Sequence, residues 1–187
     1  QGFLCIEVAT TQVFRVTNAL GEALEDQQEQ AIQHAALPEG EVVYASMDGS
    51  MILTQAGWKE VKLGRIFPGS AMEAVGKKKR NRIVESIYSA CLGSCHEFLP
   101  RFEATLGPWA DQPEQLVFIT DGAEWIRHYI QDRFPQAIHI LDYFHAVEKL
   151  AEFAKMMFPD ETRRQRWLEG QEAELHAGNV AQVLETL

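Results

Sequence analysis

The chain has 187 residues and a formal net charge of −10, with 46% hydrophobic and 24% charged residues. This balance suits one globular domain with flanking pieces and excludes a disordered chain. No apolar run approaches the ~20 residues that a membrane-spanning helix needs. The opening QGFLCIEVAT lacks the basic region and cleavage site of a signal peptide. We therefore expect a cytoplasmic protein without membrane contact.

The two ends of the chain suggest a piece of a longer protein. It begins without Met and stops at AQVLETL, inside a helix-like pattern with no Gly or Pro. Residues 1–40 are acidic, and GEALEDQQEQAIQHAAL predicts a helix that ends at the break LPEGE. We expect residues 1–40 to be a partly helical lead-in and residues 41–158 to be a catalytic core. Residues 159–187, which look helical and polar, would begin an all-helical insertion.

Three strands follow the break in succession. VVYASMDGSMILT is apolar and β-branched, whereas WKEVKLGRIF and RIVESIYSA alternate between apolar and polar residues. Their short connections predict antiparallel neighbours.

Positive charge is concentrated in this part of the chain. Residues 59–82 hold eight basic residues against Glu60 and Glu73, which leaves a net charge of +6. The run KKKRNR fits a solvated loop as well as it fits a phosphate contact. If the partner is DNA, the residues that we expect on its phosphates are Lys77, Lys78, Lys79, Arg80 and Arg82.

Helices and strands alternate in the second half. Apolar residues recur at three- and four-residue steps from Cys91 to Leu106, which predicts a helix. QLVFIT is a continuous apolar run typical of a strand buried on both faces. A helix with the stripe Trp125, Ile126, Tyr129, Ile130 and Phe134 comes next, then the strand AIHIL. A last helix carries the stripe Phe144, Val147, Ala151 and Ala154.

The cysteines do not form an obvious metal site. Their number is three, and the segment CLGSCH brings Cys91, Cys95 and His96 together. A zinc site normally shows paired C-x2-C spacings and a fourth ligand. We interpret these cysteines as buried, reduced thiols in a helix.

The predicted order is three strands, helix, strand, helix, strand, helix. Three antiparallel strands extended by two parallel strands, each reached through a helix, give a mixed sheet with right-handed crossovers. This is the order of the ribonuclease H-like fold, an α/β fold in which the first and fourth strands lie side by side. Asp48 and Asp121 fall on those two strands.

Three aspartates therefore have two interpretations each. Asp48-Gly49 is a hairpin-turn signal, Asp121 with Glu124 could form a capping box, and Asp142 with His145 could cap a helix. However, three strands expected to be neighbours all end or pause on aspartate. Carboxylates that line one sheet edge repel each other unless a cation lies between them.

Two segments, VYASMDGSMILTQAGWKEVKLGRIF and VFITDGAEWIRHYIQDRFPQAIHILDYFHAVEKL, resemble the catalytic core of DDE transposases of bacterial insertion sequences. The resemblance is to the ISKra type and, more distantly, to Mutator-like enzymes, and it covers about residues 42–158. It implies that Asp48 and Asp121 are the first two catalytic acids. The Cys-or-Asp, two residues, His motif of Mutator-like members maps to Asp142, an accessory candidate, and His145.

The resemblance implies metal-dependent DNA cleavage and strand transfer, with two Mg²⁺ or Mn²⁺ ions bound partly by Asp48 and Asp121. His145 either orients the scissile phosphate or leaving group, or is a surface histidine without a catalytic role. Glu148 and Glu152 follow on the same helix, where a Glu/Lys face is usually solvated. DNA is the implied partner, at the nucleoid of a bacterial cell, and the active complex would be a homo-oligomer.

One departure from the family matters. Its third acid, a glutamate in a Gly-Ser-Gly-x-Ile-Glu-Ser-like stretch, occurs nowhere in these 187 residues. We expect the acid to lie outside the chain and the chain alone to be inactive. Two alternatives stay open: a ribonuclease H-like nuclease without strand transfer, and a truncated derivative that binds DNA or protein without catalysis.

Overall fold

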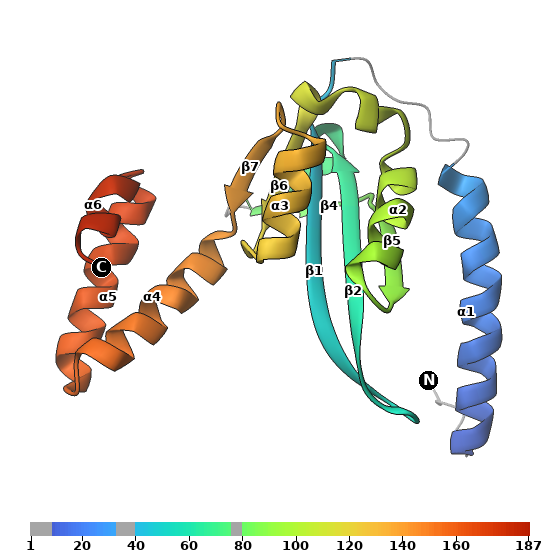
Figure 1. Cartoon of the computed structure of the whole chain (residues 1–187), viewed down its shortest axis with the longest axis horizontal. Helices are drawn as coiled ribbons and strands as arrows, with labels where there is room; N and C mark the ends of the chain where they lie inside the picture. The colour runs from blue at the N-terminus through green and yellow to red at the C-terminus, as the bar shows by residue number, and fades with distance from the viewer. Residues whose placement is uncertain (1–8, 33–39, 76–79) are drawn as a thin grey trace.

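The computed structural model describes residues 9–32, 40–75 and 80–187 (Figure 1). Its helices are α1 (Thr10–Ile32), α2 (Cys95–Leu106), α3 (Glu124–Arg133), α4 (Tyr143–Met157), α5 (Glu161–His176) and α6 (Val180–Glu185). Its strands are β1 (Val43–Thr54), β2 (Gly57–Pro68), β3 (Met72–Val75), β4 (Arg80–Ile83), β5 (Ile87–Leu92), β6 (Leu116–Thr120) and β7 (Ile138–Leu141). Single 3-10 turns lie at Gly69–Ala71, Gly107–Asp111 and Pro113–Gln115. Among these residues, no helix combines the length and apolarity that crossing a membrane requires.

Five strands form one mixed sheet in the order β5-β2-β1-β6-β7. The β1–β2 and β2–β5 pairs are antiparallel, whereas β6 pairs in parallel with both β1 and β7. The expected adjacency of the first strand and the strand QLVFIT is therefore confirmed. The fold is mixed α/β, with helices flanking the sheet.

The β1–β2 hairpin decides between the two interpretations of Asp48-Gly49. The strands pair without interruption from Val43 opposite Pro68 to Thr54 opposite Gly57, so the turn consists of residues 55 and 56. Gly57 follows the turn with a φ of 95°, a conformation that glycine adopts without strain. Asp48 lies opposite Leu63 in the middle of β1. The hairpin-turn interpretation of Asp48 is therefore wrong.

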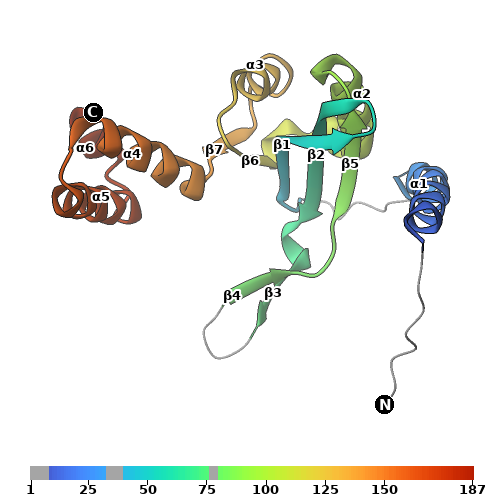
Figure 2. The same ribbon diagram turned by 90° about the horizontal axis from the view of Figure 1, so that it is seen from below.

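The third expected strand, RIVESIYSA, is divided in two. Residues 80–83 form β4, which pairs with β3 as a separate two-stranded ribbon, and residues 87–92 form β5 on the main sheet. Figure 2 shows this ribbon projecting from the sheet. Alternation along a segment indicates a strand but not the strand with which it pairs. The prediction therefore merged two strands that belong to different sheets. Lys77, Lys78 and Lys79 lie outside the described residues.

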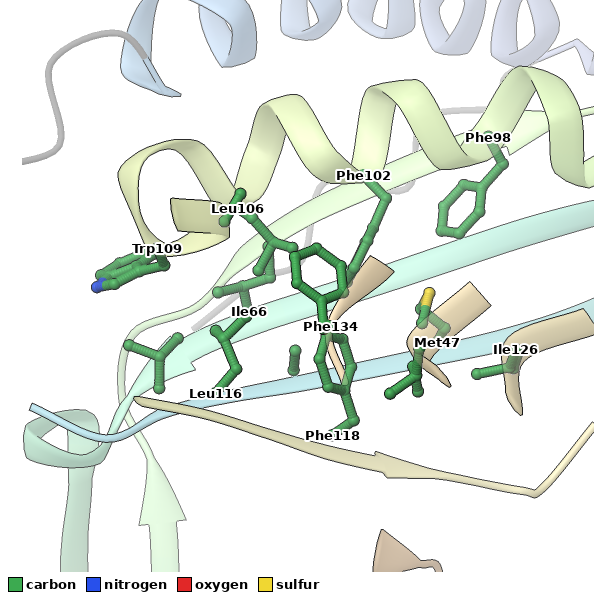
Figure 3. Close-up of a cluster of buried hydrophobic side chains, with 14 of the residues drawn as sticks. Met47, Ile66, Phe98, Phe102, Leu106, Trp109, Leu116, Phe118, Ile126 and Phe134 are labelled. Carbon is green, nitrogen blue, oxygen red and sulfur yellow. The ribbon is translucent and has the colours of Figure 1, made fainter. Parts of the chain in front are cut away.

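Helices α2 and α3 cover one face of the sheet (Figure 2). Phe98, Phe102 and Leu106 of α2 are fully buried against that face (Figure 3). The Phe118 ring of β6 lies 6.5 Å from Phe102 and 5.5 Å from the ring of Phe134, which follows α3. The expected α3 stripe is confirmed, because its residues are buried or packed on this core.

Helix α2 begins four residues later than its apolar spacing suggested. Ser94 is the N-cap, and the Glu97 carboxylate accepts 2.8 Å hydrogen bonds from the Ser94 backbone N–H and hydroxyl. These hydrogen bonds hold the pKa of Glu97 below its ordinary value. Cys91 is a free, buried thiol on β5, so its expected helical position is wrong. Cys95 is a free, partly buried thiol at the start of α2.

Helices α4, α5 and α6 form an arm that extends away from the sheet (Figure 1). Leu150 and Ala154 are the buried residues of α4, and the rings of Phe153 and Trp167 lie 5.6 Å apart between α4 and α5. Phe144, expected on the inner stripe, is 78% exposed. That expectation is wrong because α4 buries the side that contacts the other helices of the arm. The spacing of apolar residues along α4 does not show where those helices lie.

Gly64 of β2 tests the packing beneath α2. A Cβ on this residue would overlap the Phe102 ring and lie 2.6 Å from Ser89 Oγ. Gly64→Ala should therefore lower the free energy of unfolding by about 1–3 kcal/mol, measured by urea denaturation. Gly170→Ala in α5 is the control, since nothing lies within 4 Å of a Cβ there. An unchanged or higher urea midpoint for Gly64→Ala would contradict this packing.

Candidate active site

Strand pairing aligns three aspartates at one end of the sheet. Ala45 of β1 pairs with Phe118 of β6, and Phe118 pairs with His139 of β7. All three strands run in the same direction. Three positions farther along each of them the residue is aspartate: Asp48, Asp121 and Asp142. We call these three residues the aspartate edge.

The aspartate edge belongs to the face of the sheet that α2 and α3 leave open. Side chains alternate between faces along a strand, and in β1 the residues Val43, Ala45 and Met47 are buried in the core. Asp48 has the opposite parity and is exposed. Leu63, its partner on β2, is 44% exposed. The carboxylate of Asp48 therefore projects from the surface opposite the hydrophobic core.

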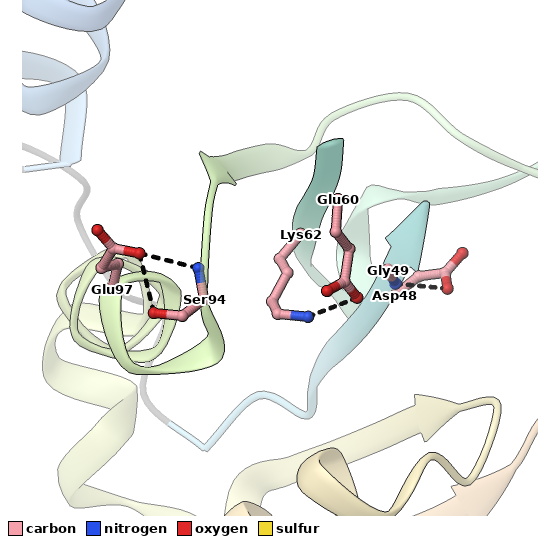
Figure 4. A network of polar contacts seen from close by, with 6 residues as sticks. All are labelled: Asp48, Gly49, Glu60, Lys62, Ser94 and Glu97. Atoms are coloured by element: carbon pink, nitrogen blue, oxygen red, sulfur yellow. Dashed lines mark hydrogen bonds and ion pairs between the residues drawn. The ribbon is translucent and has the colours of Figure 1, made fainter. Parts of the chain in front are cut away.

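Each aspartate also makes a local hydrogen bond. Asp48 Oδ1 accepts the Gly49 N–H at 2.7 Å, and Figure 4 shows its carboxylate directed away from Glu60 and Lys62. Asp121 Oδ1 accepts the Ala123 N–H at 2.9 Å, which is an Asx turn. Both carboxylates are thus held by backbone N–H groups at the strand positions where the chain places them.

The expected capping box at Asp121 and Glu124 is wrong. Helix α3 has Ala123 as its N-cap, with no side-chain capping bond. Gly122 has a φ of 80°, which lets the chain turn between Asp121 and the helix. Asp121 therefore precedes the cap position and orders the turn into α3.

Asp142 is the N-cap of α4, as the capping interpretation predicted. Its Oδ1 accepts the His145 N–H at 3.1 Å and lies 3.1 Å from His145 Nδ1. The Asp142 backbone N–H donates to the Thr120 carbonyl at 2.7 Å, so the cap is tied to the end of β6. The imidazole of His145 is consequently fixed on the first turn of α4, with its side chain 44% exposed.

The next turns of α4 place charged side chains within electrostatic range of Asp121. Lys149 Nζ lies 3.0 Å from Glu152 Oε2, and both side chains are largely exposed. The hydrogen bond to Glu152 is the main reason that the pKa of Lys149 is raised, and the charges of Glu148 and Asp121 add to it. Glu152 is thus engaged in a local ion pair on the exposed face of α4.

Two of the basic candidate residues lie on the β3–β4 ribbon. The ribbon leaves β2 near Pro68, which pairs with Val43 at the start of β1, whereas Asp48 lies in the middle of β1 and Asp121 and Asp142 follow β6 and β7. Arg80 and Arg82 are on β4, and Arg82 is exposed opposite Glu73. These two arginines are therefore separated from the aspartates along the sheet.

One partly buried pair beneath this edge has no counterpart in the sequence patterns. Thr120, 2% exposed, has its Oγ1 2.8 Å from Nε2 of His139 on β7. Burial lowers the pKa of His139 below its ordinary value of 6.5. A threonine and a histidine on separate strands show no spacing pattern, so only the β6–β7 pairing reveals them.

The donor chemistry of the edge suits a hard divalent cation, because such ions prefer carboxylate oxygens and retain several waters. Asp48 and Asp121 can each supply such an oxygen. Within the described ranges, no three His, Cys, Asp or Glu side chains form a group able to hold a metal ion. The aspartates present fit part of a metal site.

Comparison with known proteins does not assign a family. No protein-family model and no curated protein matches the chain. Its function is therefore inferred from the residues themselves.

The partly buried His139 should make stability depend on pH. Its pKa is lower in the folded state than in the unfolded state, so the neutral ring favours folding above pH 6.5. As the pH falls below 6.5, the unfolded chain takes up the proton first and stability declines. His139→Gln should reduce this decline in urea titrations between pH 7.5 and 5. The exposed His128→Gln is the control, and equal slopes for both variants would contradict the role of His139.

Proposed function

We propose that this chain carries the catalytic core of a DDE-type DNA transposase with a ribonuclease H-like fold. Its reaction would be metal-dependent DNA strand cleavage and strand transfer during transposition of a bacterial insertion sequence. The strand order supports this proposal, because three antiparallel strands are followed by two parallel strands reached through helices. The resemblance of residues 42–158 to such enzymes points the same way.

The alignment of Asp48 with Asp121 is the observation that carries the proposal. Both aspartates follow the last β1–β6 pair, Ala45–Phe118, by three residues and have the strand parity of the open face. Carboxylates that approach each other at one end of two adjacent strands repel unless a cation lies between them. A structural turn or cap needs only one aspartate and gives no reason for a second one beside it.

Asp48 and Asp121 would hold the metal, with Asp48 as the best candidate for a bridging ligand. When bound, Mg²⁺ or Mn²⁺ would supply activation of the attacking water or 3'-hydroxyl and charge stabilisation of the leaving oxygen. The Asx turn at Asp121 and the Gly49 N–H at Asp48 each hold one carboxylate oxygen in place. Such preorganisation lowers the entropic cost of assembling a site.

His145 would contact a phosphate oxygen or the leaving group. Asp142 holds its backbone N–H and lies beside Nδ1, which leaves Nε2 as the ring atom for a substrate contact. Asp142 is then an accessory residue that orients His145. It also links α4 to β6 through Thr120.

A third acid would complete the site from outside these 187 residues. Glu148 and Glu152 are exposed on α4, and Glu152 already pairs with Lys149. The open face of the sheet beside Asp48 gives an additional acidic segment direct access. DNA would be the partner, and the active complex would be a homo-oligomer that holds both transposon ends.

Metal binding by this chain tests the proposed site. Asp48→Asn and Asp121→Asn should each weaken Mn²⁺ binding by about tenfold or more, because each removes a charged oxygen ligand. Electron paramagnetic resonance of free Mn²⁺ provides the measurement. Asp132→Asn, an exposed position on α3, is the control and should bind as the parent chain does. Equal affinities for all four proteins would refute the shared site.

Cleavage distinguishes a transposase core from a metal-binding module. A protein extended to include the third acid should cut and join supercoiled plasmid carrying the element's ends, and either aspartate variant should abolish both steps. The 187-residue chain alone should not nick, because two-metal chemistry needs both ions in place. Cutting without joining by the extended protein would favour a nuclease instead.

The run KKKRNR at the end of the segment 59–82 should bind phosphates, whereas Lys62 of the same segment is buried and paired with Glu60. Neutralising Lys77, Lys78, Lys79 and Arg80 together should weaken DNA binding equally for unrelated sequences, since phosphate contacts carry no base information. The slope of log affinity against log salt should flatten by about 3–4. Fluorescence anisotropy at several salt concentrations measures both effects. An unchanged slope would identify the segment as a solvated loop.

A further inference from the structure

Lys62 is an unusual residue for the interior of this protein. It lies on β2, is 4% exposed and has the strand parity of the core residue Ile66, so it faces the covered side of the sheet. Lysine is almost never buried unless its charge is paired. Here Nζ lies 2.6 Å from Glu60 Oε1 and 4.6 Å from the centre of the Trp125 ring. The ammonium is therefore held between a carboxylate of its own strand and an aromatic ring of α3.

The position of Lys62 connects the two halves of the proposed site. Lys62 pairs with Gly49, the residue after Asp48. Trp125 follows Asp121 by four residues, in the first turn of α3. The Lys62–Trp125 contact thus joins the β1–β2 hairpin that carries Asp48 to the helix that begins after Asp121.

Backbone pairing does not provide this connection at the level of the aspartates. The β1–β6 ladder covers residues 43–45 of β1 and residues 116–118 of β6. Asp48 and Asp121 lie three positions past its last pair, so their separation depends on side-chain packing. A cation over an aromatic ring is a directional contact that strengthens when water is excluded.

Gly49 provides the space for this arrangement. A Cβ at that position would lie 2.7 Å from Glu60 Oε1 and 3.8 Å from Lys62 Nζ. The ion pair therefore lies directly against the backbone of β1 beside Asp48, as Figure 4 shows. Asp48 projects from the opposite face, so Lys62 does not occupy the space available to a substrate or metal.

We propose that Lys62 is a positioning residue that fixes the separation of Asp48 and Asp121 through its contact with Trp125. The inference rests on the proposed function, in which these aspartates share one metal site. A buried ion contributes little to stability compared with an apolar side chain of similar size. An apolar side chain such as methionine could fill the same space but could not make the directional contact with Trp125. Fixing the geometry of the site therefore accounts for a lysine at this position.

A cross-linking experiment tests the separation without any metal. The three cysteines at positions 5, 91 and 95 are first replaced by Ala, and Asp48→Cys and Asp121→Cys are introduced together. Equilibration with glutathione then gives the effective concentration of the thiol pair, which depends on the distance between the two strands. Adding Lys62→Met should lower this effective concentration by about threefold or more.

Three further variants control the experiment. Lys62→Arg keeps the cation over the ring and should restore the effective concentration. Trp125→Leu removes the ring instead of the charge, should have the same effect as Lys62→Met, and provides a second route if Lys62→Met does not fold. Lys155→Met, an exposed lysine in the last turn of α4, should have no effect.

The outcome for Lys62 is separable from that for the proposed function. Equal effective concentrations with Lys62 and Met at that position, or no cross-link in the parent protein, would overturn the positioning role. Mn²⁺ binding by the chain with its native aspartates is measured in parallel. If that chain fails to bind Mn²⁺ although cross-linking depends on Lys62, the proposed function fails while the positioning role stands.

Discussion

The parallel pairing of β1 with β6 is the constraint on which the rest of this structure depends. It involves only residues 43–45 and 116–118, yet it joins the antiparallel hairpin to the helix-connected half of the sheet. Val43, Ala45, Leu116 and Phe118 contribute to the buried core beneath α2 and α3, so a shift of one position would move them to the open face. The same register gives Asp48 and Asp121 equivalent positions, each three residues past the last pair. Core packing thus determines which residues face the candidate site.

The two faces of the sheet have different roles. The covered face contains the aromatic core and continues, past the end of the core, into the Lys62–Trp125 contact. The open face carries the aspartates beside exposed apolar side chains such as Leu63 and Ile140. Carboxylates on an open surface can be reached by a large substrate and by an additional acid, whereas a buried cation behind them can adjust their spacing without blocking access.

Charge is also divided along the sheet. Asp121 and Asp142 follow the ends of β6 and β7, Asp48 lies in the middle of β1, and the β3–β4 ribbon leaves β2 opposite the start of β1. A small substrate could not contact both regions. An extended polyanion could, with phosphates on Arg80 and Arg82 of the ribbon and a cation between it and the aspartates. This separation agrees with the DNA substrate that we propose.

The sequence by itself determined the elements whose signals are local: the long strands β1 and β2, the apolar strand β6 and the buried stripe of α3. It also selected Asp48, Asp121, Asp142 and His145 as candidate site residues. Only the tertiary structure decided which strands pair, and this explains why RIVESIYSA was joined across two sheets and why Phe144 was assigned to a buried stripe. It also decided that Asp142 caps a helix, that Asp121 forms an Asx turn and that Asp48 lies within a strand. The role of Lys62 was likewise hidden, because spacing along a strand predicts the direction of a side chain but not the ring that an α-helix will place above it.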